Sequence, residues 1–477
     1  MTAVVSSPYW ERYGWPTRPA AGAVRRGLTG FDLALICLFM AGLYTNYTIP
    51  ISDKLPFPSA PAGLAGVIML WRRRQSIGGK PFAGLLVVLL LYVLSILVAP
   101  DITFLPRRFN GLVQLTYSIL IGYGLFLTVS QGTRRQISRL FLCASLIILT
   151  GCLLETYGGL RPISDSVRQV LYPRGLYEND LRDMLMYRRV RPKFFASEPA
   201  SVTFCYSLFT FIWFVVSRMR LKLVLYVALM AAGIFAMPGP TLLLMLLLVL
   251  PYMLFLASRR NGRFNALRFA QVGVIAALFC GSFLVLVAVV FPERFQRAQA
   301  GDDASFFYRV RGPAIAGIDS LEHAPTGAGL TGEPYIADHV VNLYVQSSAY
   351  STGWRMVTPA TELLINYFWL HWIYLGPFLG LILIGAISLW LRALGVPSPA
   401  FCWFAWAILG QASGAYVGPT CWAVLFLTGA AAMIHQRRDE PAPAGYWAQA
   451  VPRSSASRAL PRTSASKNDQ PPAPDAA

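Results

Sequence analysis

The chain has 477 residues, of which 55% are hydrophobic and 13% are charged, and its mean hydropathy is +0.51. A soluble domain carries about 25% charged residues, so this composition indicates a polytopic membrane protein. The formal net charge is +19, but much of the Lys and Arg lies in short clusters between apolar runs, where basic residues set membrane topology. The charge therefore gives no reason to expect nucleic acid as a partner.

Twelve apolar segments approach the length of about 20 residues that a helix needs to cross a bilayer. They lie at residues 30–49, 57–71, 81–99, 110–130, 139–158, 199–217, 221–237, 239–257, 268–291, 363–391, 398–414 and 416–435. The sequence therefore predicts an all-α fold, a polytopic helical bundle of about 12 transmembrane helices. Residues 1–28 contain no apolar core, so they predict a cytoplasmic N-terminal segment rather than a cleavable signal peptide.

Basic residues gather in every second short connection between these segments. The clusters are Arg72, Arg73, Arg74 and Lys80; Arg134, Arg135 and Arg139; Arg218, Arg220 and Lys222; Arg259, Arg260, Arg263 and Arg268; and Arg437 with Arg438. Cytoplasmic loops are enriched in Lys and Arg, so both termini are predicted to be cytoplasmic. The transmembrane domain at residues 29–435 would be followed by a disordered cytoplasmic tail at residues 436–477, which has almost no large apolar residues.

Two connections on the opposite side are long and polar, at residues 157–197 and 291–360. Loops of this length usually carry function, and we expect both to face outward, away from the cytoplasm, and to contain short helices. The first holds eight cations, namely Arg161, Arg168, Arg174, Arg182, Arg188, Arg189, Arg191 and Lys193. Such a group suits a phosphate-bearing ligand at the membrane surface, because guanidinium groups hold phosphate oxygens in a bidentate fork.

A solvated loop with internal ion pairs, such as Asp183 with Arg188, is the alternative for most of these cations. Arg191 differs from the others because it lies seven residues before the next helix start, at Glu198. It cannot stray far from the bilayer surface.

The pair Glu198-Pro199 predicts a helix start. A residue before proline is pushed out of the α region and proline is favoured at the first helical position, so Glu198 is expected as the N-cap. Its carboxylate would lie near the positive end of the helix. The same carboxylate could also accept a proton from a sugar hydroxyl or orient that hydroxyl, and the sequence leaves both interpretations open.

The second long loop contains Ser305 and Arg309, which are spaced i, i+4 and would share one helical face, with Arg311 close by. Further on, Gly327 and Gly329 allow a tight turn with close backbone approach to a ligand. The alternative is an amphipathic helix that lies on the headgroups with its arginines facing water.

The four histidines, His323, His339, His371 and His435, show no metal-ligand spacing, and no D-x-D triplet is present. We therefore expect no metal and no cofactor. The seven cysteines lie inside or at the edges of apolar segments and are predicted to be buried hydrophobes. The middles of the predicted spans are almost free of ionisable residues, which argues against an ion-coupled transporter.

Three motifs in this order resemble the O-antigen ligase and polymerase superfamily of bacterial inner-membrane proteins, on its Wzy-type polymerase side. The first is Arg191 followed by Ser197-Glu198-Pro199-Ala200-Ser201; the second is Ser305-x3-Arg309 leading through Ala314-Ile315 to Pro325-x-Gly327-x-Gly329; the third is Tyr374-Leu375-Gly376-x3-Gly380. The resemblance covers residues 30 to 435.

The chain departs from the family pattern at three places. Phe194 stands where the family usually has Gly, and Ala200 stands where it often has Ser. No His or Asn stands out before the last long span, where Thr361 or Glu362 lies near the expected position.

The resemblance implies a polymerase that transfers a growing glycan from undecaprenyl pyrophosphate to the next lipid-linked repeat unit, at the periplasmic face of the inner membrane. Arg191 and Arg309 would hold the pyrophosphate leaving group, and Glu198 would act as base or orient the acceptor. The substrate-binding residues would include Lys193, Ser305, Arg311, Gly327 and Gly329. The family pattern implies no metal, and the expected partners are membrane lipids, a chain-length regulator and other polysaccharide export proteins.

Three alternatives remain at this stage. A ligase of the same superfamily would move a finished glycan onto lipid A core or a protein. A lipid-linked oligosaccharide flippase or transporter would also suit twelve spans, although it should have a cationic central cavity made by the spans. A membrane-anchored assembly subunit would use the Arg-rich loops as docking surfaces.

Overall fold

The structure is a computed structural model that describes residues 27–52, 55–172, 177, 180–257, 259–260, 263–264, 270–271, 273–274, 277, 281, 296, 306–346 and 363–437. Several sequence predictions lie outside these residues. They are Ser305, most of the apolar segment at 268–291, nearly all of the N-terminal segment 1–28 and the tail 436–477, and much of the loop 291–360, together with Thr361 and Glu362.

The described elements are helices apart from two short hairpins, so the prediction of an all-α fold is confirmed. The long and short α-helices are α1 (Gly30–Thr45), α2 (Ala60–Arg73), α3 (Gly79–Leu97), α4 (Leu105–Val129), α5 (Arg134–Tyr157), α6 (Arg161–Leu171), α7 (Asp180–Tyr187), α8 (Pro199–Val216), α9 (Lys222–Ala236), α10 (Pro240–Met245), α11 (Val249–Pro251), α15 (Gly312–His323), α16 (Glu333–Val345), α17 (Tyr367–Ala393), α18 (Pro399–Gly410) and α19 (Pro419–Gln436). Short 3-10 or π turns are η2 (Arg74–Ser76), η3 (Ile102–Phe104), η4 (Leu246–Leu248), η5 (Tyr252–Ala257) and η6 (Phe307–Arg311). The antiparallel hairpins pair β1 (Ile49–Ser52) with β2 (Leu55–Phe57), and β3 (Arg259–Arg260) with β4 (Arg263–Phe264).

Helices form in every predicted apolar segment that falls within the described ranges. Five of them are long and apolar enough to cross a membrane: Gly79–Leu97, Ile102–Val129, Arg134–Tyr157, Pro199–Val216 and Tyr367–Ala393. Shorter apolar helical stretches occupy Gly30–Thr45, Lys222–Ala236, Thr241–Ala257 and Pro399–Gly410. The apolar helices fit a membrane protein, and the count of about twelve spans stays a prediction.

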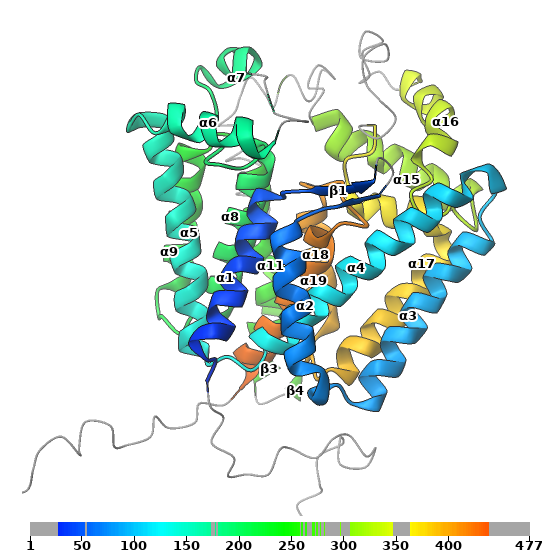
Figure 1. The fold of residues 1–477 in the computed structure, drawn as a ribbon, viewed down its shortest axis with the longest axis horizontal. Helices are drawn as coiled ribbons and strands as arrows, with labels where there is room; N and C mark the ends of the chain where they lie inside the picture. The colour runs from blue at the N-terminus through cyan, green and yellow to red at the C-terminus, as the bar shows by residue number, and fades with distance from the viewer. Residues whose placement is uncertain are drawn as a thin grey trace, which may run out of the picture. The chain divides into compact units, whose positions relative to one another are not determined.

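The described residues up to Gln436 form one compact unit of helices packed side by side (Figure 1). In it α4 packs on α2 and α19, α5 packs on α8, and α3 packs on α17. Helix α8 lies deepest, with nearly all of its residues buried, because its side chains are apolar on every face. The pairing joins segments far apart in the chain into one bundle.

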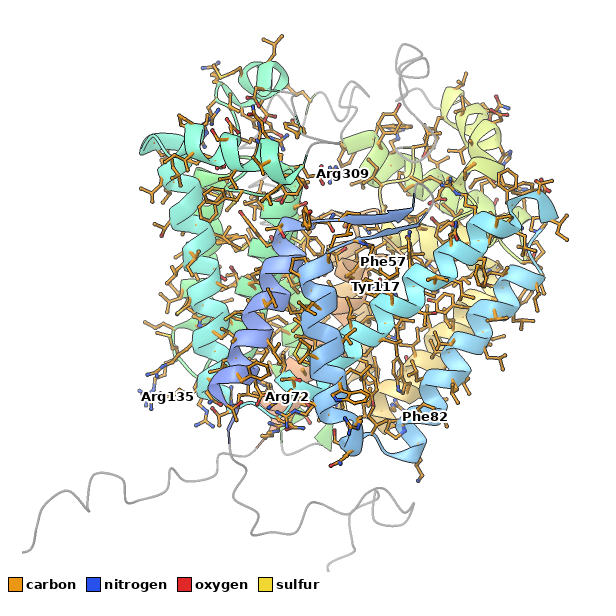
Figure 2. The ribbon with its side chains drawn as sticks, viewed as in Figure 1. Phe57, Arg72, Phe82, Tyr117, Arg135 and Arg309 are labelled. Atoms are coloured by element: carbon orange, nitrogen blue, oxygen red, sulfur yellow. The ribbon has the colours of Figure 1, made fainter. Side chains whose placement is uncertain are left out.

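The short helices of the two long loops gather at one end of this bundle. Figure 1 shows α6, α7, α15 and α16 at the top of the view. Figure 2 places Arg309 toward the same end, whereas Arg72 and Arg135 of the basic clusters lie at the opposite end. The cation-rich loops and the short basic connections are therefore segregated within the molecule.

Helix α17 is broken in its first half at Gly376, which has φ +66° and ψ −179°, and Pro377 follows at once. Proline cannot donate a backbone hydrogen bond and its ring clashes with the preceding turn, so the pair interrupts the helical ladder. Irregular backbone is tolerated at membrane depth only where it is buried in protein or lines a cavity. Here the freed carbonyls of Ile373 and Tyr374 accept hydrogen bonds from the backbone of the second long loop.

Candidate functional site

The buried carboxylate of Glu155, at the end of α5, binds the backbone of the segment that precedes α8. One of its oxygens accepts the backbone N–H of Lys193 at 3.0 Å, and the other accepts the Ser164 hydroxyl at 3.2 Å and the backbone N–H of Phe194. A carboxylate bound by several donors in a buried site strongly restricts the backbone that it holds. Glu155 is therefore a structural anchor for this segment.

Arg168 of α6 fixes the backbone immediately before Glu198. Its side chain is 1% exposed; Nε donates to the Ala196 carbonyl at 2.8 Å and Nη2 to the Ser197 carbonyl at 3.1 Å. The remaining nitrogen, Nη1, pairs with Asp165 at 2.7 Å. Arg168 is thus a positioning residue, a role that its place among eight loop cations did not reveal.

Replacing Arg168 with Ala should therefore destabilise the fold by roughly 2–4 kcal/mol, because the buried Ala196 carbonyl and the half-buried Ser197 carbonyl lose charge-assisted donors. The loss should also reduce any activity that depends on Glu198. Thermal unfolding of the detergent-purified protein measures the first effect. Arg168→Lys should recover part of the stability, and the control Arg161→Ala, which removes one bond to the Val190 carbonyl, should cost less. An Arg168→Ala protein as stable as wild type would contradict the assignment.

Phe194 occupies a backbone conformation that favours glycine. Phe194 has φ +34° and the next residue, Phe195, has φ +64°. Hydrogen bonds hold both carbonyls in this turn: Tyr44 donates to the Phe194 carbonyl at 2.7 Å and Tyr172 donates to that of Phe195 at 3.0 Å. Phe194 therefore lies in a left-handed turn, and its ring fills the space over Gly151.

Two predicted ligand-binding cations are engaged in ion pairs with acidic residues of α7. Arg191 contacts the buried carboxylate of Asp183 at 2.9 Å and donates to the Tyr177 hydroxyl at 2.8 Å. The buried Lys193 pairs with Asp180 at 2.7 Å. Asp183 thus pairs with Arg191 and not with Arg188, the partner expected from the sequence.

Arg191 nevertheless keeps part of its guanidinium available. Its side chain is 20% exposed, and its Nη1 makes no hydrogen bond with any described residue. Burial lowers the pKa of Arg191, but the neighbouring Tyr187, Tyr177 and Asp183 outweigh burial and leave the pKa above its usual value. The group is positively charged at every physiological pH.

Glu198 starts α8 as predicted. Its backbone is extended, with φ −147° and ψ 156°, and Pro199 is the first helical residue, but its side chain makes no capping hydrogen bond. The carboxylate is exposed and has no hydrogen-bond or ion-pair partner among the residues the structure covers. A rigid backbone therefore presents an unpaired carboxylate to the outside.

The glycines of the second loop pack directly on the break in α17. The backbone N–H of Ala328 donates to the Ile373 carbonyl at 2.8 Å, and that of Gly329 donates to the Tyr374 carbonyl at 3.0 Å. A Cβ on Gly327, where φ is +69°, would lie 2.5 Å from the Tyr374 oxygen. The turn at these glycines lies close to the backbone of α17, and its predicted approach to a ligand stays a prediction.

Arg309 lies on η6, which packs at the start of α17. Its Nη1 donates to the Ala412 carbonyl at 2.9 Å, and its own carbonyl accepts from the Asn366 side chain at 2.8 Å. Asn366 is fully buried and also donates to Gln411 at 2.8 Å. It links η6 to the end of α18, and η6 in turn holds Arg309.

Asn366 is also the N-cap of α17, because its Oδ1 accepts the backbone N–H groups of Phe368 and Trp369. An Asn immediately before an apolar run is a recognised helix-start signal. Asn366 was not predicted as a site residue; Thr361 or Glu362 was placed near this position instead. Asn366 stands where an Asn or His was sought.

A further set of polar side chains, which was not predicted from the sequence, contacts the broken helix α17. Tyr374 donates to Glu333 of α16, which pairs with Arg107 at 3.7 Å. Deeper in the bundle, the Tyr416 hydroxyl contacts Tyr92 at 2.7 Å and His371 at 2.9 Å. These contacts tie α17 to both the second loop and the core.

The predicted site residues of the first long loop and those of the second make contacts with different helices. Arg191 and Lys193 belong with α7, whereas Arg309, Gly327 and Gly329 belong with α17. The side chain of Arg311 is exposed on η6, and within the described part of the chain it makes no hydrogen bond or ion pair with either group. Among the described residues, no group of three or more His, Cys, Asp or Glu side chains is placed to hold a metal ion.

No protein-family model matches this sequence, and no curated protein matches it.

Proposed function

We propose that this protein polymerises undecaprenyl-pyrophosphate-linked oligosaccharide units into O-antigen or exopolysaccharide. The observation that supports the proposal is the packing of two motifs of the resemblance on each other. The turn at Gly327 and Gly329 bonds to Ile373 and Tyr374 beside the break at Gly376. The second and third motifs, which are separate in the sequence, thus pack into one structural unit. Arg309 lies beside this unit, because its carbonyl accepts a hydrogen bond from Asn366 at the start of α17.

The proposed reaction uses groups at the end of the bundle that carries the loop helices. The acceptor hydroxyl oxygen would bond to the anomeric carbon while the bond from that carbon to the phosphate oxygen breaks. Glu198 would take the hydroxyl proton. Arg309 and the free Nη1 of Arg191 would stabilise the charge that develops on the departing pyrophosphate.

The proposed setting is the bacterial inner membrane, with about twelve spans, both termini in the cytoplasm and the two long loops in the periplasm. The segregation of Arg72 and Arg135 from Arg309 supports this orientation (Figure 2), because cytoplasmic connections collect basic residues. A chain-length regulator and other export proteins would act with the polymerase.

Replacing Arg309 or Arg191 with Gln should abolish long polymer when the amount of polymer is normalised to the amount of protein in the membrane. Removing a charge-assisted contact that strengthens in the transition state costs about 10²–10³-fold in rate. Electrophoresis of the polysaccharide measures chain length, and immunoblotting measures the protein.

Arg188 offers a matched control for this experiment. It is an exposed loop cation with φ +55°, so Arg188→Gly removes a charge without straining the backbone. This variant should make full-length polymer. Full-length polymer from Arg191→Gln and Arg309→Gln as well would contradict the proposed roles.

A further inference from the structure

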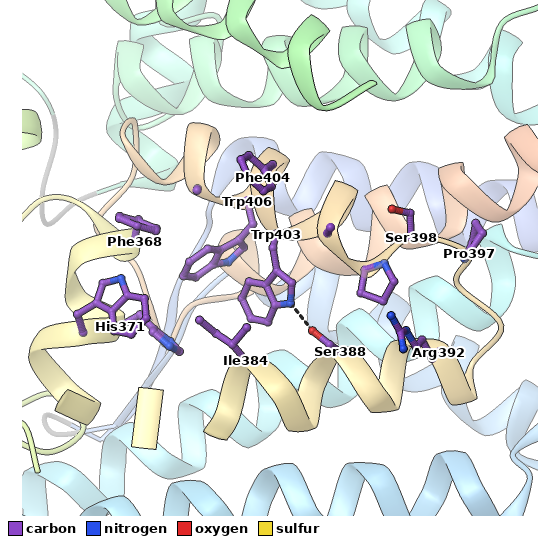
Figure 3. Close-up of a pocket in the computed structure, with 14 residues that line it drawn as sticks. Phe368, His371, Ile384, Ser388, Arg392, Pro397, Ser398, Trp403, Phe404 and Trp406 are labelled. Atoms are coloured by element: carbon purple, nitrogen blue, oxygen red, sulfur yellow. Dashed lines mark hydrogen bonds between the residues drawn. The ribbon is translucent and has the colours of Figure 1, made fainter. Parts of the chain in front are cut away.

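A groove of about 580 Å³ runs between α17 and helix α18 (Figure 3). In the second half of α17 its wall is formed by Ile384, Ser388 and Arg392, which are spaced four residues apart and so share one face of the helix. In the first half of α17 the lining includes Phe368, His371 and Trp372. The other wall includes Trp403, Phe404 and Ala407 of α18. The groove is therefore elongated along two helices and mostly apolar.

The aromatic wall is held in place by contacts among its own residues. Trp403 donates its Nε1–H to the Ser388 hydroxyl at 2.9 Å across the groove (Figure 3). Its ring packs edge-on against Trp406 with centroids 5.3 Å apart. The polar atoms of the wall are thus satisfied, and the surface left for a ligand is apolar and preformed.

Arg392 marks one end of the groove with a cation. Its side chain is exposed and makes no hydrogen bond or ion pair with any residue in the described part of the chain. Helix α18 starts at the same end, where Ser398 and Pro399 line the groove, so the positive end of its dipole adds to the potential there. An apolar channel that ends at an unpaired guanidinium suits an amphiphile with an anionic headgroup.

The end that carries Arg392 is also the basic end of the bundle. Trp390, two residues earlier, lies against Gly84 near the start of α3, and α3 follows the cluster Arg72, Arg73 and Arg74. In the proposed orientation this end faces the cytoplasm, where the membrane surface is rich in anionic lipids. Amphiphiles with an anionic headgroup are therefore abundant at the end of the groove where Arg392 lies.

We propose that the groove binds one anionic diacyl phospholipid of the cytoplasmic leaflet. One acyl chain lies between Ile384 and Trp403, and the phosphate pairs with Arg392 by charge-assisted hydrogen bonds. A free phosphate would leave the apolar walls unused, and a zwitterionic lipid would place a positive group beside the guanidinium. The site is separate from the loop residues that the polymerase reaction would use.

Native mass spectrometry of the delipidated protein in detergent tests this site with two probes that share their acyl chains, dioleoyl phosphatidylglycerol and dioleoyl phosphatidylcholine. Wild type should bind the first about tenfold more tightly, the difference expected from one charge-assisted contact. Arg392→Ala should lose this preference. Arg135→Ala removes an exposed arginine from the same end of the bundle and should keep it.

A second variant tests the groove itself and does not depend on charge. Ala407→Trp fills the channel and should reduce binding of both lipids, whereas Leu389→Trp, on the exposed face of α17 outside the groove, should not. Equal binding of the two lipids by wild type would overturn the proposal, as would an unchanged preference in Arg392→Ala or full lipid binding in Ala407→Trp. An isoprenoid phosphate as the retained native lipid would overturn it too. None of these results bears on the polymerase proposal, which polymer length tests separately.

Discussion

Replacing Glu198 with Gln should abolish long polymer without destabilising the protein. The carboxylate is exposed and has no hydrogen-bond partner among the residues described, so an amide of the same size disturbs no contact. An amide cannot take a proton from the acceptor hydroxyl, and loss of a general base typically costs about 10²–10⁴-fold in rate. Polysaccharide electrophoresis and thermal unfolding of the purified protein measure the two effects separately.

Glu322→Gln is the matched control for this substitution. Glu322 is an exposed carboxylate on α15, at the same end of the bundle, and it also has no described partner. The control should make polymer of normal length. Normal polymer from Glu198→Gln would leave Glu198 as a helix start and nothing more.

Replacing Gly376 with Ala should destabilise the protein by roughly 2–5 kcal/mol, through left-handed strain and overpacking together. Gly376 has φ +66°, and a Cβ there would lie 2.4 Å from the Pro325 carbonyl oxygen and 2.7 Å from that of Ala324. Both are backbone atoms in the turn that also carries Gly327 and Gly329, so they cannot move aside without breaking its bonds to α17. Thermal unfolding in detergent measures the loss.

Gly385 provides the comparison on the same helix. A Cβ at Gly385 meets nothing within 4 Å, so Gly385→Ala should be neutral or slightly stabilising. Equal unfolding temperatures for wild type and Gly376→Ala would show that the turn and the broken helix are not tightly joined.

The helices of the predicted spans could be found because each lies in an apolar run, and hydropathy reports such runs directly. The break in α17 was not predicted, although Gly376-Pro377 carries the signal within an otherwise apolar span. The start of α8 at Glu198-Pro199 was predicted correctly because it depends on local backbone rules alone.

The site was harder to predict because its key contacts join residues distant in sequence. Arg168 binds carbonyls 28 and 29 residues away, and a backbone carbonyl carries no residue identity that a sequence could reveal. Glu155 likewise binds backbone N–H groups of Lys193 and Phe194. The choice of Asp183 as the partner of Arg191 depends on how α7 folds back over the segment before α8.

The two glycine motifs were recognised in the sequence, but their contact with each other was not predicted. The sequence predicted a tight turn at Gly327 and Gly329 with close backbone approach to a ligand. In the structure the turn lies against the backbone of Ile373 to Gly376, and ligand binding at this turn stays a prediction. Gly327 and Gly376 are therefore needed for the close packing of the motifs at residues 325–329 and 374–380. The polymerase proposal gives the two motifs a role in the reaction in addition.

The most direct test of the proposed function is the identity of the lipid-linked glycans that accumulate when the protein is removed from its native cells. Extraction of undecaprenyl-pyrophosphate lipids, followed by mass spectrometry, measures the number of repeat units on each lipid. The proposal predicts single repeat units on the periplasmic side of the membrane. Long lipid-linked chains would instead indicate a ligase, single units held on the cytoplasmic side would indicate a flippase, and either result would contradict the polymerase assignment.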